Sequence, residues 1–266
     1  MIDIQNQKDS RKIDIQKVGV KDVEIPLSIV RKGDNKNQLV YANAKMSVSL
    51  PHHYKGTHMS RFIEILNDYR EKNLVGVDIH KMLKEMCEKL DAKSAYLKFD
   101  FKYFIKKTAP SSNLKALMCY DCYFEGILDN DNYKFFLGAK VPLTTLCPCS
   151  KEISDCGAHN QRATVKVKVS YPENEHIWLE DLISEIEDCG SSEVYSLLKR
   201  EDEKYVTEQA WNNPKFVEDV LRDVVIKLNE NKVIDFFEVE IEAHESIHNH
   251  NAWAYQKSEK LFNLLQ

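Results

Sequence analysis

The chain lacks any long apolar run and contains little glycine or proline. No window approaches the roughly 18 apolar residues that a membrane-spanning helix needs, so we expect no membrane insertion. The opening "MIDIQNQKDSRKIDIQ" has no apolar core and no small-residue cleavage site, which argues against a secretory signal. Eight glycines and seven prolines among 266 residues exclude a collagenous or low-complexity chain.

The chain also lacks an excess of positive charge. Its formal net charge of -5 argues against a protein that coats nucleic acid, but leaves room for a local basic pocket that binds a phosphorylated small molecule. The seven cysteines form no regular framework, so we expect reduced thiols in a cytoplasm, some of them binding metal.

The first half shows a change of hydrophobic period. Residues 1–20 are polar and unpatterned, which predicts a mobile tail, with a tail that closes over a site as the alternative. Strands are predicted in "PLSIVRK", over 42–50, over 97–103 and in "LKALMCYDCYFEGIL". Asp78 is the expected N-cap of the second of two helices between them. The two apolar helix stripes are Phe62, Ile65, Leu66 and Tyr69, then Ile79, Leu83, Met86 and Leu90.

The second half repeats this element order. Strands are predicted in "YKFFLGAKVPLTT", over 163–169 and over 237–241, with a final strand left open. Helices are expected over 177–188, 193–200 and 214–230, with Asn213 as the last N-cap and Pro214 at the first helical position. The repeat predicts two ββααββ-type modules, residues 21–130 and 131–266. Antiparallel sheets with helices on one face, an α+β class, fit this order best.

The stretch "HESIH", from His244 to His248, matches the H-E-x-x-H pattern of zinc proteases. That pattern needs a helix, because both histidines must reach one ion from the same face. Here it follows a predicted strand, and an extended chain would separate the two histidines by roughly 13 Å. We therefore expect no zinc protease; the alternative is a polar strand end with solvated histidines.

A second cluster occurs in "LCPCSKEISDCGAHNQR", where three cysteines lie within twelve residues of His159. Thiolate and imidazole are suitable ligands for Zn²⁺, Fe²⁺ or Mn²⁺, although unremarkable loop thiols are the alternative. Cys119 and Cys122 fall in a predicted strand, where their spacing points them to opposite faces, so we interpret them as packing thiols.

Two charged stretches look ordinary on their own. "KREDEKYVTE" is typical of a solvated charge run. In "NNPKFVEDVLRD", Glu218 and Arg222 have the spacing of a weak surface ion pair on a helix.

Taken in order and spacing, "LCPCSKEIS", "GAHNQR", "LKREDEKYVTE", "NPKFVED" and "ESIHNHNA" resemble the type IB GTP cyclohydrolase family over about residues 20–255. The resemblance implies the tunnelling fold, with tandem modules whose sheets join across subunits into barrels. It implies at least a dimer and suggests a tetramer, with active sites at the interfaces. The implied reaction converts GTP and water to 7,8-dihydroneopterin triphosphate and formate, the first step toward folate-type pterins.

The resemblance also implies a metal site. Cys147 and His159 match two ligands, and Glu203 matches the third. Glu201 is a weaker candidate, because the run reads "REDE" where we expect a proline. Cys149 lies beside the metal, as a ligand or a substrate contact. Ligand type permits Zn²⁺, Mn²⁺ or Fe²⁺, any of which would lower the pKa of the water that attacks C8 of guanine.

The remaining motif residues suit proton transfer and substrate binding. His248 fits general acid–base work, with Glu245 orienting it or shuttling protons. By resemblance, Glu218 accepts the N1–H and 2-amino donors of guanine. Lys151 and Arg162 flank the metal motif and are the weaker candidates for binding the triphosphate.

Three alternatives stay open at this stage. A family variant would give a 2′,3′-cyclic phosphate of dihydroneopterin, which mass spectrometry separates from a triphosphate. Another tunnelling-fold activity, NADPH-dependent nitrile reduction of a deazaguanine, uses a nucleophilic cysteine and no metal, so a chelator would leave it untouched. A non-catalytic, thiol-rich metal-binding protein would turn over no GTP and would bind metal normally after His248→Ala.

Overall fold

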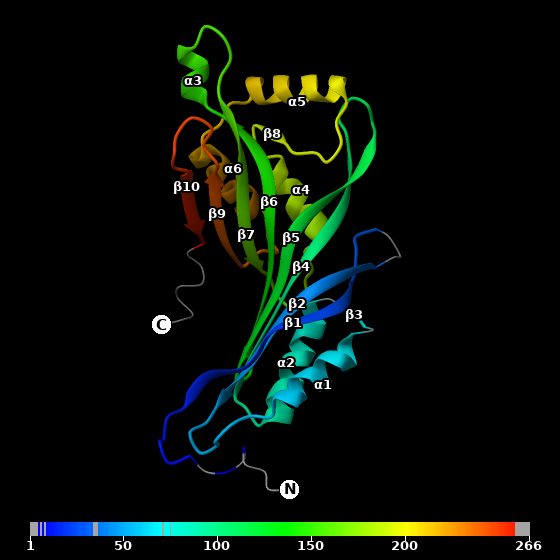
Figure 1. The fold of residues 1–266 in the computed structure, drawn as a ribbon, viewed down its shortest axis with the longest axis vertical. Coiled ribbons are helices and arrows are strands. Elements are labelled where there is room, and N and C mark those ends of the chain that lie inside the picture. Colours follow the sequence, from blue (N-terminus) through cyan, green and yellow to red (C-terminus); the bar gives the residue numbers. More distant parts are fainter. Residues whose placement is uncertain are drawn as a thin grey trace. The chain divides into compact units, whose positions relative to one another are not determined.

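The computed structural model describes residues 5, 7, 9–33, 37–70, 72–74 and 76–258. Helices and an antiparallel arrangement of strands confirm the α+β class. The chain divides into two compact units (Figure 1). Unit 1 comprises Met1–Lys102 and Tyr123–Leu137, and unit 2 comprises Tyr103–Cys122 and Gly138–Gln266. Each is described separately below.

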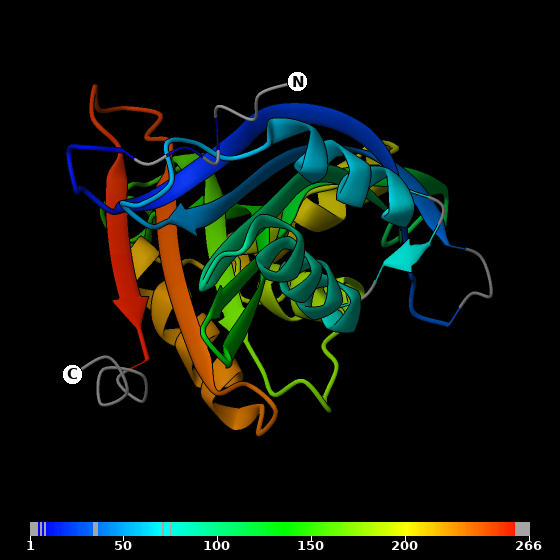
Figure 2. The same cartoon turned by 90° about the horizontal axis from the view of Figure 1, so that it is seen from below.

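Unit 1 is a twisted sheet covered by two helices. Its strands follow the order β6-β5-β4-β2-β1-β3, in which β2 pairs antiparallel with β1 and β4, and β3 pairs parallel with β1. Helices α1 and α2 lie together against one face (Figure 2). The elements are β1 Ile15–Ile29, β2 Gln38–Leu50, α1 Met59–Tyr69, β3 Asn73–Leu74, α2 Gly76–Leu90 and the unit 1 parts of β4 Ser94–Thr108, β5 Lys115–Asp129 and β6 Asn132–Leu146.

The predicted apolar stripes of both unit 1 helices are buried, as expected. Helix α2 packs so closely on β5 that a Cβ at Gly126 would lie 2.4 Å from a methyl carbon of Ile79. The predicted cap is wrong, because α2 begins at Gly76 and Asp78 lies in its first turn. There Asp78 pairs with Lys81 at 3.1 Å.

The predicted tail over residues 1–20 is wrong from Ile15 onward, where β1 begins. The pairing of β1 with β2 shifts register between Ile15 and Val18 and again between Val20 and Val23. Such bulges break the alternation of period two, which is why the sequence pattern concealed the strand. Before the strand, the backbone carbonyls of Gln5 and Gln7 accept hydrogen bonds from Gly56 and Lys55. Residues 1–4, 6 and 8 lie outside the described residues.

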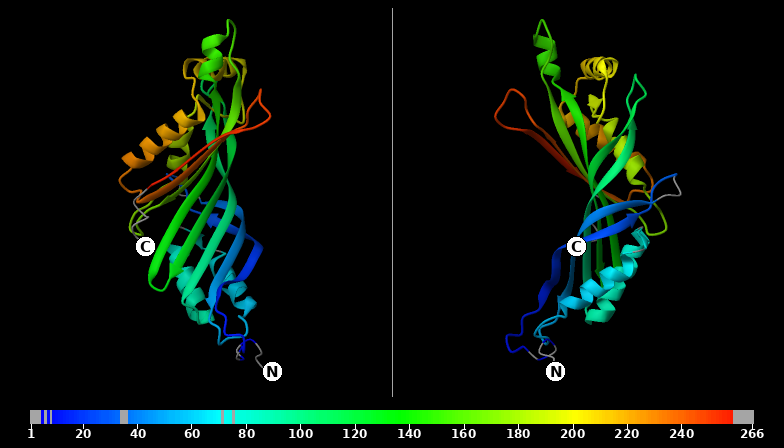
Figure 3. Two further views of the ribbon diagram at one scale, coloured as in Figure 1. Left: turned by 90° about the vertical axis from the view of Figure 1, so that its left-hand side faces the viewer. Right: turned by 45° about the vertical axis from the view of Figure 1, so that its right-hand side comes forward.

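Unit 2 has the strand order β10-β9-β7-β6-β5-β4, with the short β8 paired to β6. Strand β9 pairs antiparallel with β7 and β10, and α6 runs along β9 and β10 (Figure 3). Its further elements are α3 Pro148–Ile153, β7 Asn160–Ser170, α4 Leu179–Glu187, β8 Ser192–Glu193, α5 Arg200–Asn212, α6 Val217–Glu230, β9 Phe236–Ala243 and β10 Ala252–Lys257.

Two helix predictions in unit 2 need correction. The segment 193–200 is not a helix: β8 ends at Glu193, a link follows, and α5 begins at Arg200. Helix α5 escaped prediction because it buries only Asp202 and Ala210 and so has no apolar stripe. Asn213 and Pro214 do not begin α6, which instead starts at Val217. The Asp219 carboxylate accepts a hydrogen bond from the backbone N–H of Phe216 at 3.0 Å and closes that first turn.

In the described parts of the chain, every helix is too short or too polar to cross a membrane.

Candidate functional site

The segment from Cys147 to His159 forms a closed loop in unit 2. The backbone N–H of Cys147 donates to the carbonyl of His159 at 3.0 Å. Ser150 fixes the interior: its backbone N–H donates to Cys147 Sγ at 3.4 Å, and its hydroxyl donates to the Cys147 carbonyl at 3.2 Å. The same hydroxyl accepts from the His159 N–H at 3.2 Å. The structure therefore places the two predicted ligands, Cys147 and His159, at the two ends of one closed loop.

The imidazole of His159 is held by a polar side chain from the start of β7. Its Nδ1 lies 3.0 Å from Gln161 Oε1, and Gln161 Nε2 donates to Thr145 Oγ1 at 3.0 Å. Metal-binding histidines commonly use one ring nitrogen for such a contact and the other for the ion. The contact leaves Nε2 of His159 as the nitrogen suited to a ligand.

The seven cysteines are all free. Cys147 is half-buried as the N-cap of α3, whereas Cys149 and Cys156 are exposed on or after that helix. The packing interpretation of the "CYDC" pair is supported only for Cys122, whose burial raises the pKa of its thiol far above the ordinary value. Cys119 is exposed, so it is not a buried packing thiol.

The charge run provides the N-cap and most of α5, and the buried Asp202 in its first turn overturns the interpretation of a solvated run. Glu201 and Glu203 are exposed, but Asp202 is fully buried. Its carboxylate accepts hydrogen bonds from the backbone amides of Ser111, Ser112 and Lys199, each at 2.8 Å, and from the Ser112 hydroxyl at 2.6 Å. Burial on its own raises the pKa of Asp202, but these hydrogen bonds outweigh it and hold the pKa well below its usual range.

Asp202 thus ties the start of α5 to the β4–β5 turn and fixes the helix turn that carries Glu201 and Glu203.

Within the described part of the chain, no group of three or more His, Cys, Asp or Glu side chains is arranged to hold a metal ion. A thiolate and an imidazole in one loop nevertheless fit a divalent transition metal. The predicted third ligand, Glu203, stays a prediction.

Of the two candidate phosphate-binding cations, Lys151 lies on α3 within the Cys147–His159 loop and Arg162 lies just after it. The ammonium of Lys151 donates to the backbone carbonyl of Trp211 at the end of α5 and lies 4.7 Å from the centroid of the indole ring. Arg162 is exposed at the start of β7, where its carbonyl accepts from the backbone N–H of His244 at 2.8 Å. Their role with a triphosphate stays a prediction.

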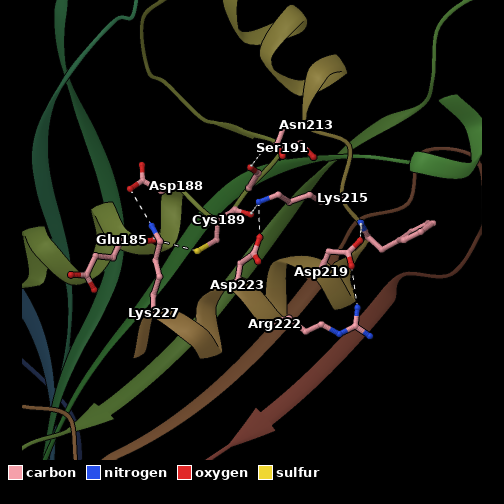
Figure 4. Close-up of polar contacts among 12 residues, drawn as sticks. Glu185, Asp188, Cys189, Ser191, Asn213, Lys215, Asp219, Arg222, Asp223 and Lys227 are labelled. Carbon is pink, nitrogen blue, oxygen red and sulfur yellow. Dashed lines mark hydrogen bonds and ion pairs between the residues drawn. The ribbon is translucent and has the colours of Figure 1, made fainter. Parts of the chain in front are cut away.

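A polar network anchors the start of α6 beside the Cys147–His159 loop (Figure 4). The backbone N–H of Lys215 donates to the carbonyl of Leu146, the residue before Cys147, at 3.0 Å. The Lys215 ammonium contacts the Cys189 carbonyl at 3.0 Å and Asp223 at 2.7 Å. Asn213 Nδ2 also donates to the carbonyl of Gly190 at 2.9 Å. The segment that precedes Glu218 by three residues therefore abuts the segment that precedes Cys147.

Glu218 is exposed in the first turn of α6. The expected ion pair of Glu218 with Arg222 is wrong, because Arg222 pairs with Asp219 at 3.0 Å (Figure 4). The carboxylate of Glu218 is thus not committed to that pair, and its role toward guanine stays a prediction.

The stretch "HESIHNHN" forms an irregular connection between β9 and β10. It is not a helix, so the structure removes the zinc-protease interpretation. His248 Nδ1 lies 3.4 Å from Glu245 Oε2, and its ring stacks on His250 with centroids 5.2 Å apart. The Glu245 side chain is 12% exposed and that of His248 53%, so a sheltered carboxylate faces an accessible imidazole.

The structure therefore brings the four motifs to one end of the unit 2 sheet. The contacts of Leu146, Trp211 and Arg162 join the Cys147–His159 loop and its flanks to the link before α6, to α5 and to the His-rich connection. Sequence reasoning missed Ser150, Gln161 and Asp202. Only Asp202 had a signal, since an acidic residue three positions after a helix N-cap is a common capping arrangement.

Comparison with known proteins shows the family of the chain. Residues 1–254 match the family described as "Type I GTP cyclohydrolase folE2". "GTP cyclohydrolase FolE2" of Syntrophus aciditrophicus (strain SB) is 53% identical over 259 residues, which cover 97% of this chain and 100% of the relative. The protein of the same name from Geotalea uraniireducens (strain Rf4) is 54% identical over 261 residues, covering 98% and 94% of the two chains.

Solved structures show a likeness of fold alone. A uricase from Bacillus fastidious superposes with a TM-score of 0.58 at 8% identity, covering 94% of this chain and 95% of that one. Uricase from Arthrobacter globiformis gives a TM-score of 0.52 at 7% identity, with 91% and 92% covered. Uricase is a tunnelling-fold protein, so the likeness agrees with the fold expected from the motifs.

Proposed function

Because the chain belongs to the type I GTP cyclohydrolase folE2 family, a type IB family, we propose that it converts GTP and water to 7,8-dihydroneopterin triphosphate and formate. The observation that carries this proposal is the family match over residues 1–254, together with identity above one half to relatives matched along nearly their whole length. The activity belongs to folate biosynthesis.

The proposed metal site uses Cys147, His159 and Glu203, with Glu201 as the alternative carboxylate. The closed loop and the Gln161 contact of His159 support the first two ligands. One divalent ion, Zn²⁺, Mn²⁺ or Fe²⁺, would supply Lewis acidity and a water of lowered pKa there. Cys149, exposed on α3 two residues after Cys147, is a second thiol for the ion or the substrate.

The protein's own groups handle protons and substrate. His248 accepts and returns protons at the guanine nitrogens as the five-membered ring of guanine opens. Glu245 contacts Nδ1 of His248 and orients its ring. Glu218 accepts two hydrogen bonds from N1–H and the 2-amino group of guanine, a pairing that selects guanine over adenine. Lys151 and Arg162 supply positive charge near the triphosphate.

The proposed assembly has two tandem ββααββ modules, whose sheets join across subunits into barrels. Strand β10 ends the strand order of unit 2 and exposes 60% of Trp253, which supports a further strand or subunit at that edge. We expect a homo-oligomer of at least two chains, with a tetramer suggested by the family. The free cysteines support a reducing compartment such as the cytoplasm.

Product analysis tests the proposal. Metal-loaded protein is incubated with GTP, formate is quantified, and the pterin is identified by mass spectrometry. A triphosphate with one formate per GTP consumed is expected. A 2′,3′-cyclic phosphate would move the chain to the other activity of the family, and no pterin with any of the three metals would overturn the proposed function.

A further inference from the structure

The side chains behind His159 form a short relay into the interior of unit 2. Thr145 lies at the end of β6 and is 1% exposed. Its hydroxyl accepts from Gln161 Nε2 at 3.0 Å, and Gln161 Oε1 lies 3.0 Å from His159 Nδ1. Both residues behind the imidazole are uncharged, and neither had a role in the motif interpretation.

With the Gln161 amide oriented as in the structure, the relay selects one tautomer of His159. When the Gln161 amide donates to Thr145 through Nε2, it turns its carbonyl oxygen toward the imidazole. A carbonyl oxygen can only accept, so Nδ1 of His159 must carry the proton. In a neutral imidazole the other nitrogen, Nε2, then has the lone pair.

We propose that Gln161, held by buried Thr145, is a positioning residue that keeps His159 in the Nδ1–H tautomer and aims Nε2 at the metal. This inference rests on the proposed function for the metal role of His159. It makes Gln161 a determinant of metal affinity rather than a ligand or a group that touches substrate. Contacts of this kind around a metal typically change affinity by about 10- to 100-fold when removed.

The first test is the tautomer itself in the metal-free, full-length protein. ¹⁵N-histidine NMR at pH 8 distinguishes the two ring nitrogens, and a His159→Gln variant assigns the signal. We expect the Nδ1–H form in the wild type and in Gln161→Glu, because a carboxylate also accepts from Nδ1–H. Gln161→Leu removes the acceptor and should give a mixture of tautomers. A wild-type His159 in the Nε2–H form would overturn the proposal.

The second test is Zn²⁺ affinity measured by competition with a chromophoric chelator. We expect the Kd to rise about 10- to 100-fold in Gln161→Leu and by a smaller factor in Thr145→Val, and to stay near the wild-type value in Gln161→Glu. Thr164→Val is the matched control, because Thr164 is a half-buried threonine of β7 outside the relay. Equal affinity of Gln161→Leu and wild type, with folding intact by circular dichroism, would contradict the relay.

These readouts need no GTP. If metal-loaded wild-type protein turns over GTP but Gln161→Leu leaves tautomer and affinity unchanged, the relay fails and the proposed function stands. If the tautomer and affinity behave as expected but no pterin forms with any metal, the proposed function fails and the relay stands.

Discussion

Unit 1 buries an almost entirely apolar interior, whereas unit 2 buries carboxylates and hydroxyls among its apolar residues. In the described part of unit 1, Ser47 and Thr57 are the only buried polar side chains. Unit 2 buries Glu187 and Asp202 together with Thr145, Ser170, Ser191 and Ser192. Helices α1 and α2 are held by apolar stripes, but α5 and the loop before α6 are held by hydrogen bonds.

The difference follows from what each unit must position. Apolar contacts hold a helix on a sheet but are not directional. Buried hydrogen bonds fix the conformation of particular loops, and the loss of one partner leaves a buried polar group unsatisfied, which lowers stability. The motif residues of the candidate site all lie in unit 2, on loops and helix ends that such bonds secure. Substitutions of motif residues in unit 2 should therefore lower activity, whereas substitutions of apolar core residues in unit 1 should lower stability.

The largest effect is expected from Cys147→Ala. Loss of the thiolate ligand should remove GTP turnover to background, by at least about 10³-fold, because metal-activated water is central to ring opening. The unfolding midpoint should change little, since Cys147 is only half-buried. Formate release measures the rate, with Cys119→Ala, an exposed cysteine of the same unit, as control. Full turnover in Cys147→Ala would show that the metal assignment is wrong.

In unit 1, Phe62→Ala should act on stability instead. The side chain is fully buried on α1, so its removal should lower the free energy of unfolding by about 3–5 kcal/mol. Ile63→Ala on the same helix is the control, because Ile63 is 37% exposed and should lose far less. Urea unfolding measures both. At a temperature where the variant is folded, kcat per folded chain should match the wild type. A large drop in kcat would contradict the separation of stability in unit 1 from catalysis in unit 2.

Lys107→Met tests the buried charges of unit 2. Lys107 lies between two carboxylates, 2.7 Å from Glu187 and 2.7 Å from Glu193, with side chains of 10%, 8% and 26% exposure. Burial raises the pKa of Glu187, and Lys107 and Tyr120 partly counter it. Removing the cation should lower the free energy of unfolding by about 3 kcal/mol, because uncompensated carboxylates remain.

The double variant Lys107→Met/Glu187→Gln should recover part of that loss in the same unfolding experiment. Lys204→Met, an exposed lysine of α5, is the matched control and should change little. If Lys107→Met proved as stable as its control, the stability of unit 2 would not depend on the buried charge of Lys107.

A smaller loss of stability is expected from Asp202→Asn, and this loss should depend on pH in a defined direction. The folded pKa of Asp202 is depressed, so its stabilisation is present above the unfolded value near 4 and is lost as pH falls below it. The variant should melt below the wild type at pH 7, and the gap should narrow as pH falls from about 5 toward 2. Thermal melts at several pH values measure this; a constant gap would exclude the carboxylate as its source.

Sequence patterns predicted the elements whose burial is apolar and periodic. The stripes around Phe62 and Ile79 located α1 and α2, and the alternation over 163–169 located β7. Helix α5 was missed because its buried anchor is Asp202, which looks like one more charge in a charged run. The bulged β1 was partly missed because register shifts hide its alternation.

For the candidate site, the motifs predicted which residue types belong together, but not how they are held. The closure of the loop by Ser150 and the relay through Gln161 depend on contacts between side chains and backbone that have no sequence period. The third metal ligand is the part that neither approach settles. The motif position of Glu203 predicts a ligand, but the structure of one chain does not group it with Cys147 and His159.

The most direct test of the account is a titration of metal-free protein with Zn²⁺, Mn²⁺ and Fe²⁺, following formate and oxidised, fluorescent pterin from GTP. The account predicts no turnover without metal and activity that saturates at about one ion per chain, as expected for a single site. Undiminished turnover by chelator-treated protein that contains no detectable metal would contradict it.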